Sequence, residues 1–264
     1  MLITFNCNKP IILIDSSYYV FYRYFATYKW YTMQKKIIEE EKFITSFIKH
    51  MESDLKKIIK KWKTDIYNIV FCIDCPRSKI WRNDIYKDYK SNRQHNQNFD
   101  QNIFKTFNEY IKNNNINYIN IDRLEADDIV YLIHNKIKSI NNKKNIIIIT
   151  NDNDYLQLID IETEIYNMQF KNIKKRTQCI DGNSNLYYKS LLGDKSDNIP
   201  KISSIITKEL ALKLCLLDID KINIWLHEKN LYEKFMFNLT LISFNYIPNE
   251  YINIFNEKYS FKLI

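Results

Sequence analysis

The stretch that decides the fold runs from Asn145 to Asp154 and reads NIIIITNDND. Four consecutive isoleucines and Thr150 form a short apolar run between polar residues. A run of this kind is typical of a strand that is buried on both faces of a parallel sheet. It is far shorter than the roughly 20 apolar residues that a membrane-spanning helix needs. We therefore predict a buried strand whose carboxyl end carries two carboxylates, Asp152 and Asp154.

Three other apolar runs also lead into acidic residues. The runs, which we predict to be further strands, are Ile11–Ile14, Ile66–Ile73 and Ile116–Ile121. The acidic residues that follow them are Asp15, Asp74, Glu125, Asp127 and Asp128. In an open parallel sheet the carboxyl ends of the strands share one edge, and ligands bind there. We therefore expect at least seven carboxylates to converge at this edge.

Such a concentration of carboxylates predicts a metal site. Like charges at short range cannot all stay ionised without compensation. Carboxylate oxygens are the ligands that Mg²⁺ and Mn²⁺ prefer, so we expect either ion there. The alternative is that each aspartate merely ends a strand or caps a helix. That alternative explains any one of these residues more readily than it explains the repeated placement.

The composition favours a nucleic-acid partner. Net charge is +8 although the acidic residues are included in the sum, and a basic surface attracts polyanions. The alternative is a basic protein whose abundant Lys and Asn reflect an AT-rich cellular or viral genome. The five scattered cysteines indicate neither a disulfide framework nor a zinc site. We expect an intracellular monomer without signal peptide, membrane partner or transmembrane segment.

The order of the elements predicts an α/β fold with a mostly parallel central sheet flanked by helices. Apolar residues at helical spacing predict helices, and a further apolar run predicts an edge strand. The helices are expected at 35–63, Leu124–Ser139, Leu186–Leu192 and Thr207–Leu217, and the edge strand at Glu164–Met168. Because the character of the sequence changes near Asp181, we place a core at residues 1–180 and a helical module at 181–264.

A long insertion at about 75–115 separates Asp74 from the next strand. Its first half alternates basic and aromatic side chains: Arg77, Lys79, Trp81, Arg82, Tyr86, Lys87, Tyr89, Lys90 and Arg93. Long insertions at the edge of a sheet are usually functional or disordered. Basic residues track a phosphate backbone and aromatic rings stack on bases, so the insertion suits a single strand. A solvated basic face is the alternative.

Six motifs in register carry a family resemblance. They are IILIDSSYYVFYRYFA around Asp15, FCID around Asp74, WRNDIYKDYKSNR at 81–93, LEADD at 124–128, ITNDNDYLQL at 149–158 and GDKSDNIP at 193–200. Over roughly residues 10–217 the chain resembles the 5′-nuclease family, which includes DNA polymerase I 5′–3′ exonuclease domains, phage 5′ nucleases and flap endonucleases. The resemblance implies a PIN-like core, a helical arch at the insertion and a helix-hairpin (H3TH-like) module that grips duplex.

The resemblance also implies site residues. The first metal would be surrounded by Asp15, Asp74, Glu125 and Asp127. The second would be served, directly or through water, by Asp128, Asp152, Asp154, Asp194 and Asp197. Catalysis would rest on Asp15, Asp74, Asp127 and Asp152 together with Lys90 and Arg93, which would contact the scissile phosphate. Nucleic acid would contact Arg82, Lys87, Tyr89, Lys90, Arg93, Lys201, Ser203 and Ser204. The hairpin, which reads KISSI at 201–205 without the family's glycines, would hold K⁺.

The implied activity is that of a metal-dependent 5′–3′ exonuclease or structure-specific flap endonuclease in DNA replication and repair. Its substrate would be DNA with a 5′ single-stranded end or flap next to duplex, and hydrolysis would leave a 5′-phosphate. An RNA-directed 5′ nuclease, RNase H-like or exoribonuclease-like, is an open alternative, with an RNA–DNA hybrid among its substrates. A nucleic-acid-binding homologue with little catalysis is another. A phospho-aspartate phosphatase would not need the basic insertion.

Overall fold

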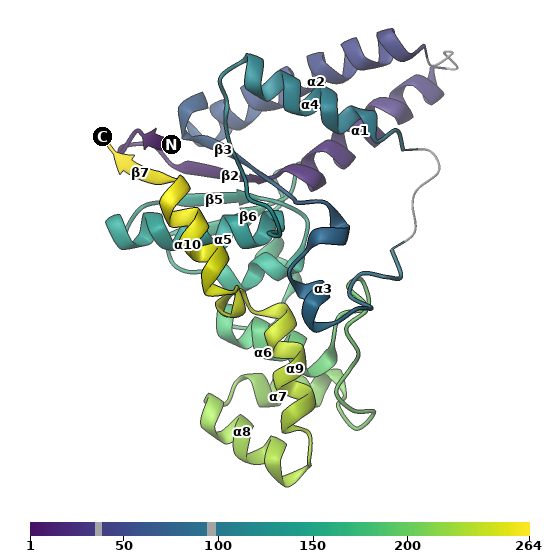
Figure 1. Cartoon of the computed structure of the whole chain (residues 1–264), viewed down its shortest axis with the longest axis vertical. Helices are drawn as coiled ribbons and strands as arrows, with labels where there is room; N and C mark the ends of the chain where they lie inside the picture. The colour runs from purple at the N-terminus through teal and green to yellow at the C-terminus, as the bar shows by residue number, and fades with distance from the viewer. Residues whose placement is uncertain (35–38, 94–98) are drawn as a thin grey trace.

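The computed structural model describes residues 1–34, 39–93 and 99–264. Its centre is a five-stranded sheet in the order β4-β3-β2-β5-β6 (Figure 1). The strands are β2 (Ile11–Asp15), β3 (Ile69–Ile73), β4 (Asn117–Asn120), β5 (Ile146–Ile149) and β6 (Thr163–Tyr166). Every pairing is parallel, so all five carboxyl ends share one edge. The predicted α/β class with a parallel sheet is confirmed.

The strands follow the predicted runs closely. β5 consists of four isoleucines that are completely buried, as expected of a strand covered on both faces. Successive residues point to opposite faces, so Ile12 of β2 packs into one hydrophobic cluster and Leu13 into the other. The second predicted strand begins later than expected, because its first three residues form the short 3-10 helix η1 (Ile66–Asn68). β6 lies at the edge of the sheet, as predicted.

One face of the sheet is covered by α1 (Ser16–Met33), α2 (Glu40–Trp62) and α4 (Asn102–Asn113) (Figure 1). α2 is amphipathic, and Phe47, Met51 and Ile58 on its inner side are fully buried. The helix predicted at 35–63 therefore exists from Glu40 onward, and residues 35–38 lie outside the described part of the chain.

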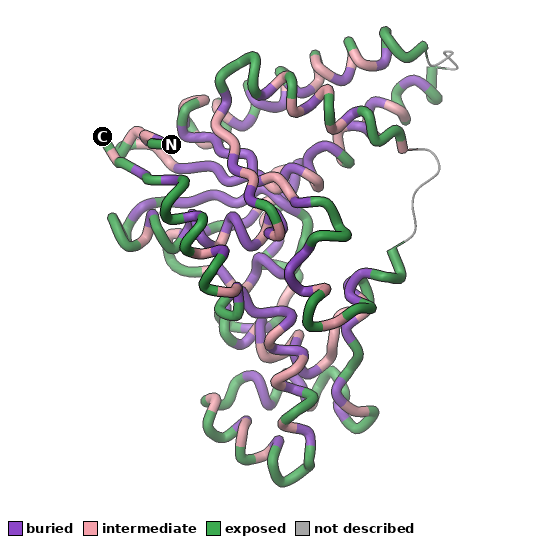
Figure 2. The backbone as a smooth tube through the Cα atoms, in the orientation of Figure 1, coloured by how far each residue is buried: buried purple, intermediate pink, exposed green. Residues whose placement is uncertain are grey.

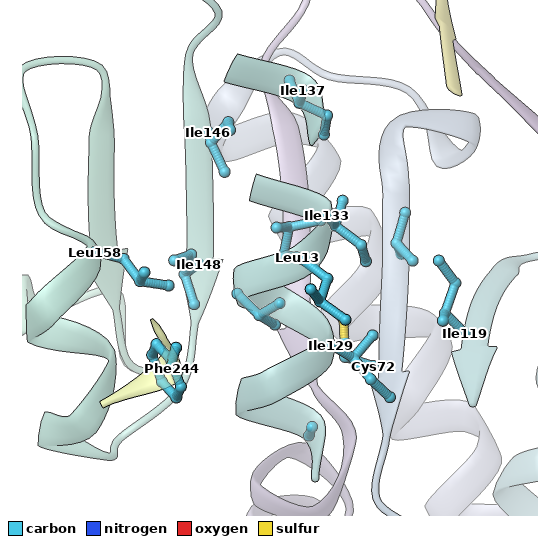
Figure 3. Close-up of a cluster of buried hydrophobic side chains, with 14 of the residues drawn as sticks. Leu13, Cys72, Ile119, Ile129, Ile133, Ile137, Ile146, Ile148, Leu158 and Phe244 are labelled. Atoms are coloured by element: carbon cyan, nitrogen blue, oxygen red, sulfur yellow. The ribbon is translucent and has the colours of Figure 1, made fainter. Parts of the chain in front are cut away.

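The other face is covered by α5 (Ala126–Ile140), the 3-10 helix η3 (Asn153–Leu158) and α10 (Asn249–Lys258). Figure 3 shows Ile129, Ile133 and Ile137 of α5 facing the side chains of the sheet. A second, two-stranded parallel sheet joins β1 (Leu2–Phe5) to β7 (Ser260–Leu263). The sequence did not predict these two strands, because each is four residues long and its partner comes from the opposite end of the chain.

A third hydrophobic cluster holds the helices α6 (Gly182–Leu192), α7 (Lys208–Cys215), α8 (Ile219–Glu228) and α9 (Tyr232–Ile242). They form the lower part of the molecule in Figure 1. The chain then returns to the sheet, because Tyr251 and Phe255 of α10 and Phe261 of β7 belong to the cluster of α5. The division of the chain at residue 180 stays a prediction.

The predicted insertion is described only in part. After β3 the chain forms the 3-10 helix η2 (Arg77–Lys79) and the short helix α3 (Arg82–Ile85), and α4 follows later. Residues 94–98, in the middle of the expected arch, lie outside the described residues. Figure 2 shows the buried strands at the centre of the molecule and the more exposed helices around them. Within the described residues, no helix is both long and apolar enough to cross a membrane.

Candidate active site

The candidate site lies where the strand order reverses. The chain passes from β2 to its neighbour β3 on one side, and it later returns to β5 on the other side of β2. Crevices at such reversals, outside the carboxyl ends of the strands, are the usual ligand sites of open α/β sheets. Asp15 ends β2, Asp74 follows β3 and Asp152 follows β5, so three strands each deliver one carboxylate to this point.

These aspartates also cap local structure, as the simpler alternative holds. Asp15 accepts a hydrogen bond of 3.0 Å from the backbone N–H of Tyr18 at the start of α1. Asp152 accepts one of 3.0 Å from the N–H of Asp154 at the start of η3. Each cap uses only one carboxylate oxygen. The second oxygen of each residue takes no part in the cap, although that of Asp15 accepts hydrogen bonds from Thr150 and Tyr155, so capping alone does not exclude ligand binding.

The amino end of α5 brings the remaining predicted acids to the same place. Asp74 Oδ1 accepts a 2.7 Å hydrogen bond from the backbone N–H of Ala126, the first residue of that helix. Glu125 and Asp127 lie on either side of Ala126. The partial positive charge at a helix amino end favours nearby carboxylates. The helix therefore positions three acids from two segments at one edge of the sheet.

A cavity of about 1600 Å³ opens at this edge. The predicted acids that line it are Asp15, Asp74, Glu125, Asp127 and Asp152. The predicted nucleic-acid contacts that line it are Lys87, Tyr89, Lys90 and Arg93. The structure thus brings acids from four segments and bases from the insertion into one cavity. Four further predicted acids do not line it: Asp128, Asp154, Asp194 and Asp197.

Four cavity acids, Asp15, Asp74, Asp127 and Asp152, form what we call the open acidic group. Burial and the charges of Asp74 and Asp152 raise the pKa of Asp15 to about 7. Burial also raises the pKa of Asp74, and burial with the neighbouring charges of Asp128 and Glu125 raises that of Asp127 well above its usual value. Within the described residues, no Lys or Arg forms an ion pair with any member of this group.

Asp152 completes the open acidic group at the mouth of the cavity. Asp152 is an exposed residue. The protein around its carboxyl group nevertheless raises the pKa of Asp152, mainly by desolvation. Lys189 opposes that shift and the charges of Asp197 and Asp194 add to it. Asp152 therefore links the open acidic group to the acids of the next segment.

Three further predicted acids, Asp154, Asp194 and Asp197, form what we call the paired acidic group. They can present oxygens within 4.8 Å of one another, and each has a basic partner. Lys189 Nζ forms ion pairs with Asp154 and with Asp194, the latter at 2.5 Å. Asp197 pairs with Arg93 and, at 3.6 Å, with Lys90. Burial would raise the pKa of Asp194, but Lys189 lowers it to about 2.

Gly193 gives the paired acidic group its geometry. It ends α6 with a positive φ of 70° just before Asp194. A Cβ at this position would lie 2.5 Å from the carbonyl oxygen of Ile199 and as close to Pro200. Both the backbone conformation and the close approach therefore require glycine. Gly193, one of only two glycines in the chain, is therefore required for the turn that carries Asp194.

Glu125 and Asp128 belong to a buried charge network. Arg82 is 1% exposed, and its Nη2 donates to Asp128 Oδ1 at 2.7 Å while its Nη1 donates to Glu125 at 3.0 Å. Its Nε donates to the carbonyl of Leu241, so the network reaches α9. Burial would raise the pKa of Glu125, but Lys90 and Arg82 lower it to about 2. Arg82, predicted to contact nucleic acid, is thus placed inside the protein.

Lys90 lies at the centre of the site. It has a positive φ of 56°, which is uncommon for a residue with a side chain and often marks a functional position. Its backbone N–H donates to Asp197 O at 3.0 Å, and its ammonium pairs with Glu125. Tyr89 is also buried, and its hydroxyl donates to Glu125 and to Asp197 at 3.0 and 3.1 Å. Arg93 remains 38% exposed.

The predicted hairpin residues lie apart from the cavity. Lys201, Ser203 and Ser204 are in the loop between α6 and α7, and none of them lines the cavity. Lys201 Nζ donates to the carbonyl of Ile206 at 2.7 Å, which closes this loop on itself. Ser204 is exposed.

Sequence reasoning missed four residues at the site. Ser17 donates to Asp74, and Thr150 and Tyr155 donate to Asp15, while Lys189 holds the paired acidic group. Ser17 and Thr150 lie next to predicted acids, so their position in the motifs was an available signal. Lys189 stands five residues before Asp194, and only the packing of α6 reveals its role.

Within the described residues, two sets of acids can bring oxygens within 4.8 Å of one another and could hold a metal ion: Glu125, Asp127 and Asp128, and Asp154, Asp194 and Asp197. The open acidic group adds Asp15, Asp74 and Asp152 in the same cavity as Asp127, and its chemistry suits a hard divalent cation. Its donors are carboxylate oxygens, the set that Mg²⁺ and Mn²⁺ prefer. Burial is the main cause of the raised pKa values of Asp15, Asp74 and Asp127, and neighbouring carboxylates add to each shift, so the ionised forms require a compensating charge. A bound cation would supply that compensation and favour the ionised forms.

Comparison with known proteins identifies relatives of this chain. Residues 10–186 match the family model described as the 5′-3′ exonuclease, N-terminal resolvase-like domain. A 5′-3′ exonuclease of Buchnera aphidicola subsp. Schizaphis graminum is 30% identical over 211 residues, which cover 75% of this chain and 67% of that protein. One from Mycoplasmopsis pulmonis is 29% identical over 205 residues, and the chain spans 63% of its length.

A phage protein and a solved structure extend the match. The Ribonuclease H of Enterobacteria phage T4 is 29% identical over 259 residues, which cover 85% of this chain and 81% of that protein. The T5 D15 protein, crystallised with metal ions, has the same fold with a TM-score of 0.68 at 15% identity, over 95% of this chain and 98% of that one. The fold is therefore PIN-like, with the helical segment α6 to α9 attached. The chain belongs to the 5′–3′ exonuclease family of nucleases.

Proposed function

We propose that the protein is a divalent-metal-dependent 5′ nuclease that hydrolyses DNA phosphodiesters near a 5′ end and leaves a 5′-phosphate. The observation that carries this proposal is the open acidic group in a cavity that also holds Lys90 and Arg93. The open acidic group forms no ion pair within the described residues and suits a metal ion, and the basic side chains of the insertion beside it suit a phosphate. The substrate is DNA with a 5′ single-stranded end or flap next to duplex.

The acids divide the work of holding metal. Asp15, Asp74, Asp127 and Glu125 would hold the first ion, and Asp152 and the paired acidic group would hold the second. When bound, two such ions activate water and stabilise the attacking and leaving oxygens of an in-line displacement. Mg²⁺ and Mn²⁺ both fit the oxygen donors. Asp128 does not line the cavity, and Arg82 donates hydrogen bonds to both Asp128 and Glu125.

Lys90 and Arg93 act on the scissile phosphate. Both line the cavity, and both are held beside carboxylates in the described structure. Arg93 is partly exposed, and a phosphate oxygen would compete with Asp197 for its guanidinium. Fixed cationic donors beside a phosphate stabilise the charge that develops in the transition state. Lys87, on the exposed rim, attracts the backbone of the strand.

The bases of the single strand follow an aromatic wall of the same cavity. Phe21 of α1 is 39% exposed, and its ring centroid lies 4.4 Å from that of Phe99 and 5.6 Å from that of Phe104. All three line the cavity. Trp81 is buried and does not line the cavity, whereas Tyr89 lines the cavity but is only 5% exposed, so the exposed part of this wall comes from the phenylalanines. Base–aromatic stacking tolerates any sequence, as a nuclease without sequence preference needs.

Duplex binding belongs to α6 to α9 in this proposal. Lys201, Ser204 and Ile205 are exposed in the loop that precedes α7. The amino end of α7 favours a phosphate, and K⁺ would be held by oxygen atoms of the loop. The lack of glycine limits how closely the loop approaches a phosphate, so grip here is weaker than at the cavity. The protein acts on one substrate molecule as a monomer.

The test compares wild type with Asp152→Ala on labelled 5′-flap DNA, RNA–DNA hybrid and RNA in Mg²⁺. We expect cleavage of flap DNA to fall by roughly 100-fold or more, as when an electrostatic group of an active site is removed. Asp65→Ala is the matched control, because Asp65 precedes β3 at the opposite end of the sheet. Unchanged cleavage by Asp152→Ala would reject the site, and wild-type cleavage of RNA alone would reject DNA as the substrate.

A further inference from the structure

One carboxylate of the open acidic group is held by an unusual number of donors. Asp15 Oδ2 accepts hydrogen bonds from the hydroxyl of Thr150 at 3.0 Å and from that of Tyr155 at 3.1 Å. Asp15 Oδ1 accepts the backbone N–H of Tyr18 at 3.0 Å. An ionised carboxylate has about four lone-pair positions, so three donors leave room for about one more contact. Asp15 is therefore oriented before any ion arrives.

The hydroxyl of Tyr155 connects the segment that follows β5 to the end of β2. It lies in η3, directly after Asp154, and is 1% exposed. Its ring belongs to the hydrophobic cluster beneath the sheet edge, so the packing fixes where its hydroxyl points. Through this hydroxyl, the segment that carries Asp152 and Asp154 holds the carboxylate at the end of β2.

We infer that Tyr155 is a positioning residue that holds Asp15 ready to bind a divalent ion through a single free oxygen position. The inference rests on the proposed role of Asp15 as a metal ligand. Tyr155 lines the cavity, but the proposed role of its hydroxyl is to hold Asp15 and not to bind the ion or the substrate. Hydrogen bonds to ligand side chains orient them, and removing such a bond typically weakens metal binding on the order of tenfold.

The chain supplies a matched control in Tyr19. Its side chain is also fully buried, and its hydroxyl donates to the carbonyl of Met51 at 3.3 Å. It packs in the other hydrophobic cluster, against α2, and does not line the cavity. Tyr19→Phe thus removes a buried hydroxyl without touching an acid.

The experiment titrates the purified full chain with Mn²⁺ in the absence of nucleic acid and follows free Mn²⁺ by electron paramagnetic resonance. Tyr155→Phe is expected to weaken the tightest Mn²⁺ site by about tenfold, and Tyr19→Phe to leave it unchanged. Thr150→Val, which removes the other donor to the same oxygen, is expected to weaken it similarly. Thermal melting of each variant in EDTA identifies a temperature at which all of them are folded, and the titrations are made at that temperature.

A double-mutant cycle separates the possible failures. If Tyr155 acts through Asp15, then adding Tyr155→Phe to Asp15→Asn leaves Mn²⁺ binding as in Asp15→Asn alone. Unchanged Mn²⁺ affinity in Tyr155→Phe, with weakened affinity in Asp15→Asn, overturns the inference and leaves the proposed function standing. Unchanged affinity in Asp15→Asn overturns the ligand assignment on which both depend.

Discussion

The open and the paired acidic groups contain the same kind of side chain at the same edge of the sheet, yet their electrostatic surroundings are opposite. Lys189, Lys90 and Arg93 neutralise the paired acidic group, and the pKa of Asp194 falls to about 2. The open acidic group has no ion pair within the described residues, and the pKa of Asp15 rises to about 7. Identical carboxylates therefore differ in whether the protein itself supplies their cation.

The difference indicates how the site takes up metal. An acid that is paired with Lys or Arg must give up that partner to bind a metal ion. An acid without such a partner binds the ion without losing an ion pair. The first ion should therefore enter at the open acidic group. The second should compete with Lys189 and Arg93, which would be released toward the substrate. Removing a cation from the paired acidic group and removing a carboxylate from the open acidic group should therefore change the free energy of unfolding in EDTA with opposite signs.

The largest effect is expected when Glu125 and, in the paired acidic group, Asp197 lose the buried cation that they share, Lys90. Lys90→Met leaves Glu125 and Asp197 without the ammonium that faces them. Breaking a buried ion pair on one side costs about 3–5 kcal/mol, and we expect that loss in the free energy of unfolding measured with urea in EDTA. Adding Mg²⁺ should recover part of it, because a bound ion replaces the missing charge.

The control for this prediction is Lys9→Met, because Lys9 pairs with Asp65 at 2.7 Å on the surface. Exposed pairs contribute little, so its unfolding should be nearly unchanged. If Lys90→Met were as stable in EDTA as wild type, the ammonium of Lys90 would not be needed to stabilise Glu125 and Asp197.

An intermediate effect of opposite sign is expected at the open acidic group. Asp15→Asn removes one uncompensated charge and keeps a residue that can cap α1. Because the folded-state pKa of Asp15 is raised, to about 7, wild type loses stability as pH rises from about 4 through 7. The shift from 3.8 to about 7 corresponds to about 4 kcal/mol, but the amide nitrogen of Asn cannot accept the hydrogen bonds that one oxygen of Asp15 accepts. We therefore expect Asp15→Asn to be about 2 kcal/mol more stable than wild type at pH 8 in EDTA.

The gain from Asp15→Asn should vanish near pH 4, where wild-type Asp15 is protonated, and should shrink or reverse in Mg²⁺. Thermal melts across this pH range in EDTA and in Mg²⁺ measure both trends. An Asp15→Asn protein that is less stable than wild type at pH 8 in EDTA would show that the open acidic group carries no uncompensated charge.

The smallest effect is expected from Lys189→Met. Lys189 is only partly buried, at 18% side-chain exposure, so its pairs with Asp154 and Asp194 are partly screened. We expect a loss of about 1 kcal/mol in EDTA at neutral pH. Because the pKa of Asp194 is lowered, this contribution exists above pH 4 and is lost as pH falls toward 2.

Urea unfolding at pH 7 and pH 3 measures the contribution of Lys189. Lys213→Met, an exposed lysine of α7, is the control. A loss in Lys189→Met that persists unchanged at low pH would point to packing instead of charge.

Much of the fold and of the site follows from local sequence. The isoleucine run of β5 predicted a doubly covered strand, and the aspartates after β2, β3 and β5 predicted the sheet edge at which they meet. These inferences succeed because a run of apolar β-branched residues and the parallel arrangement leave few alternatives. β1 and β7 escaped prediction because their pairing joins the two ends of the chain.

The sequence by itself determined which residue types reach the carboxyl edge, because each acid is tied to the end of its own strand or helix. Only the tertiary structure decided which acids are neutralised. Arg82 lies inside the protein against Asp128, Lys189 reaches Asp194, and nothing basic reaches Asp15 within the described residues. The reason is physical: ion pairing depends on a few ångströms between segments far apart in the chain, and no local pattern encodes that distance.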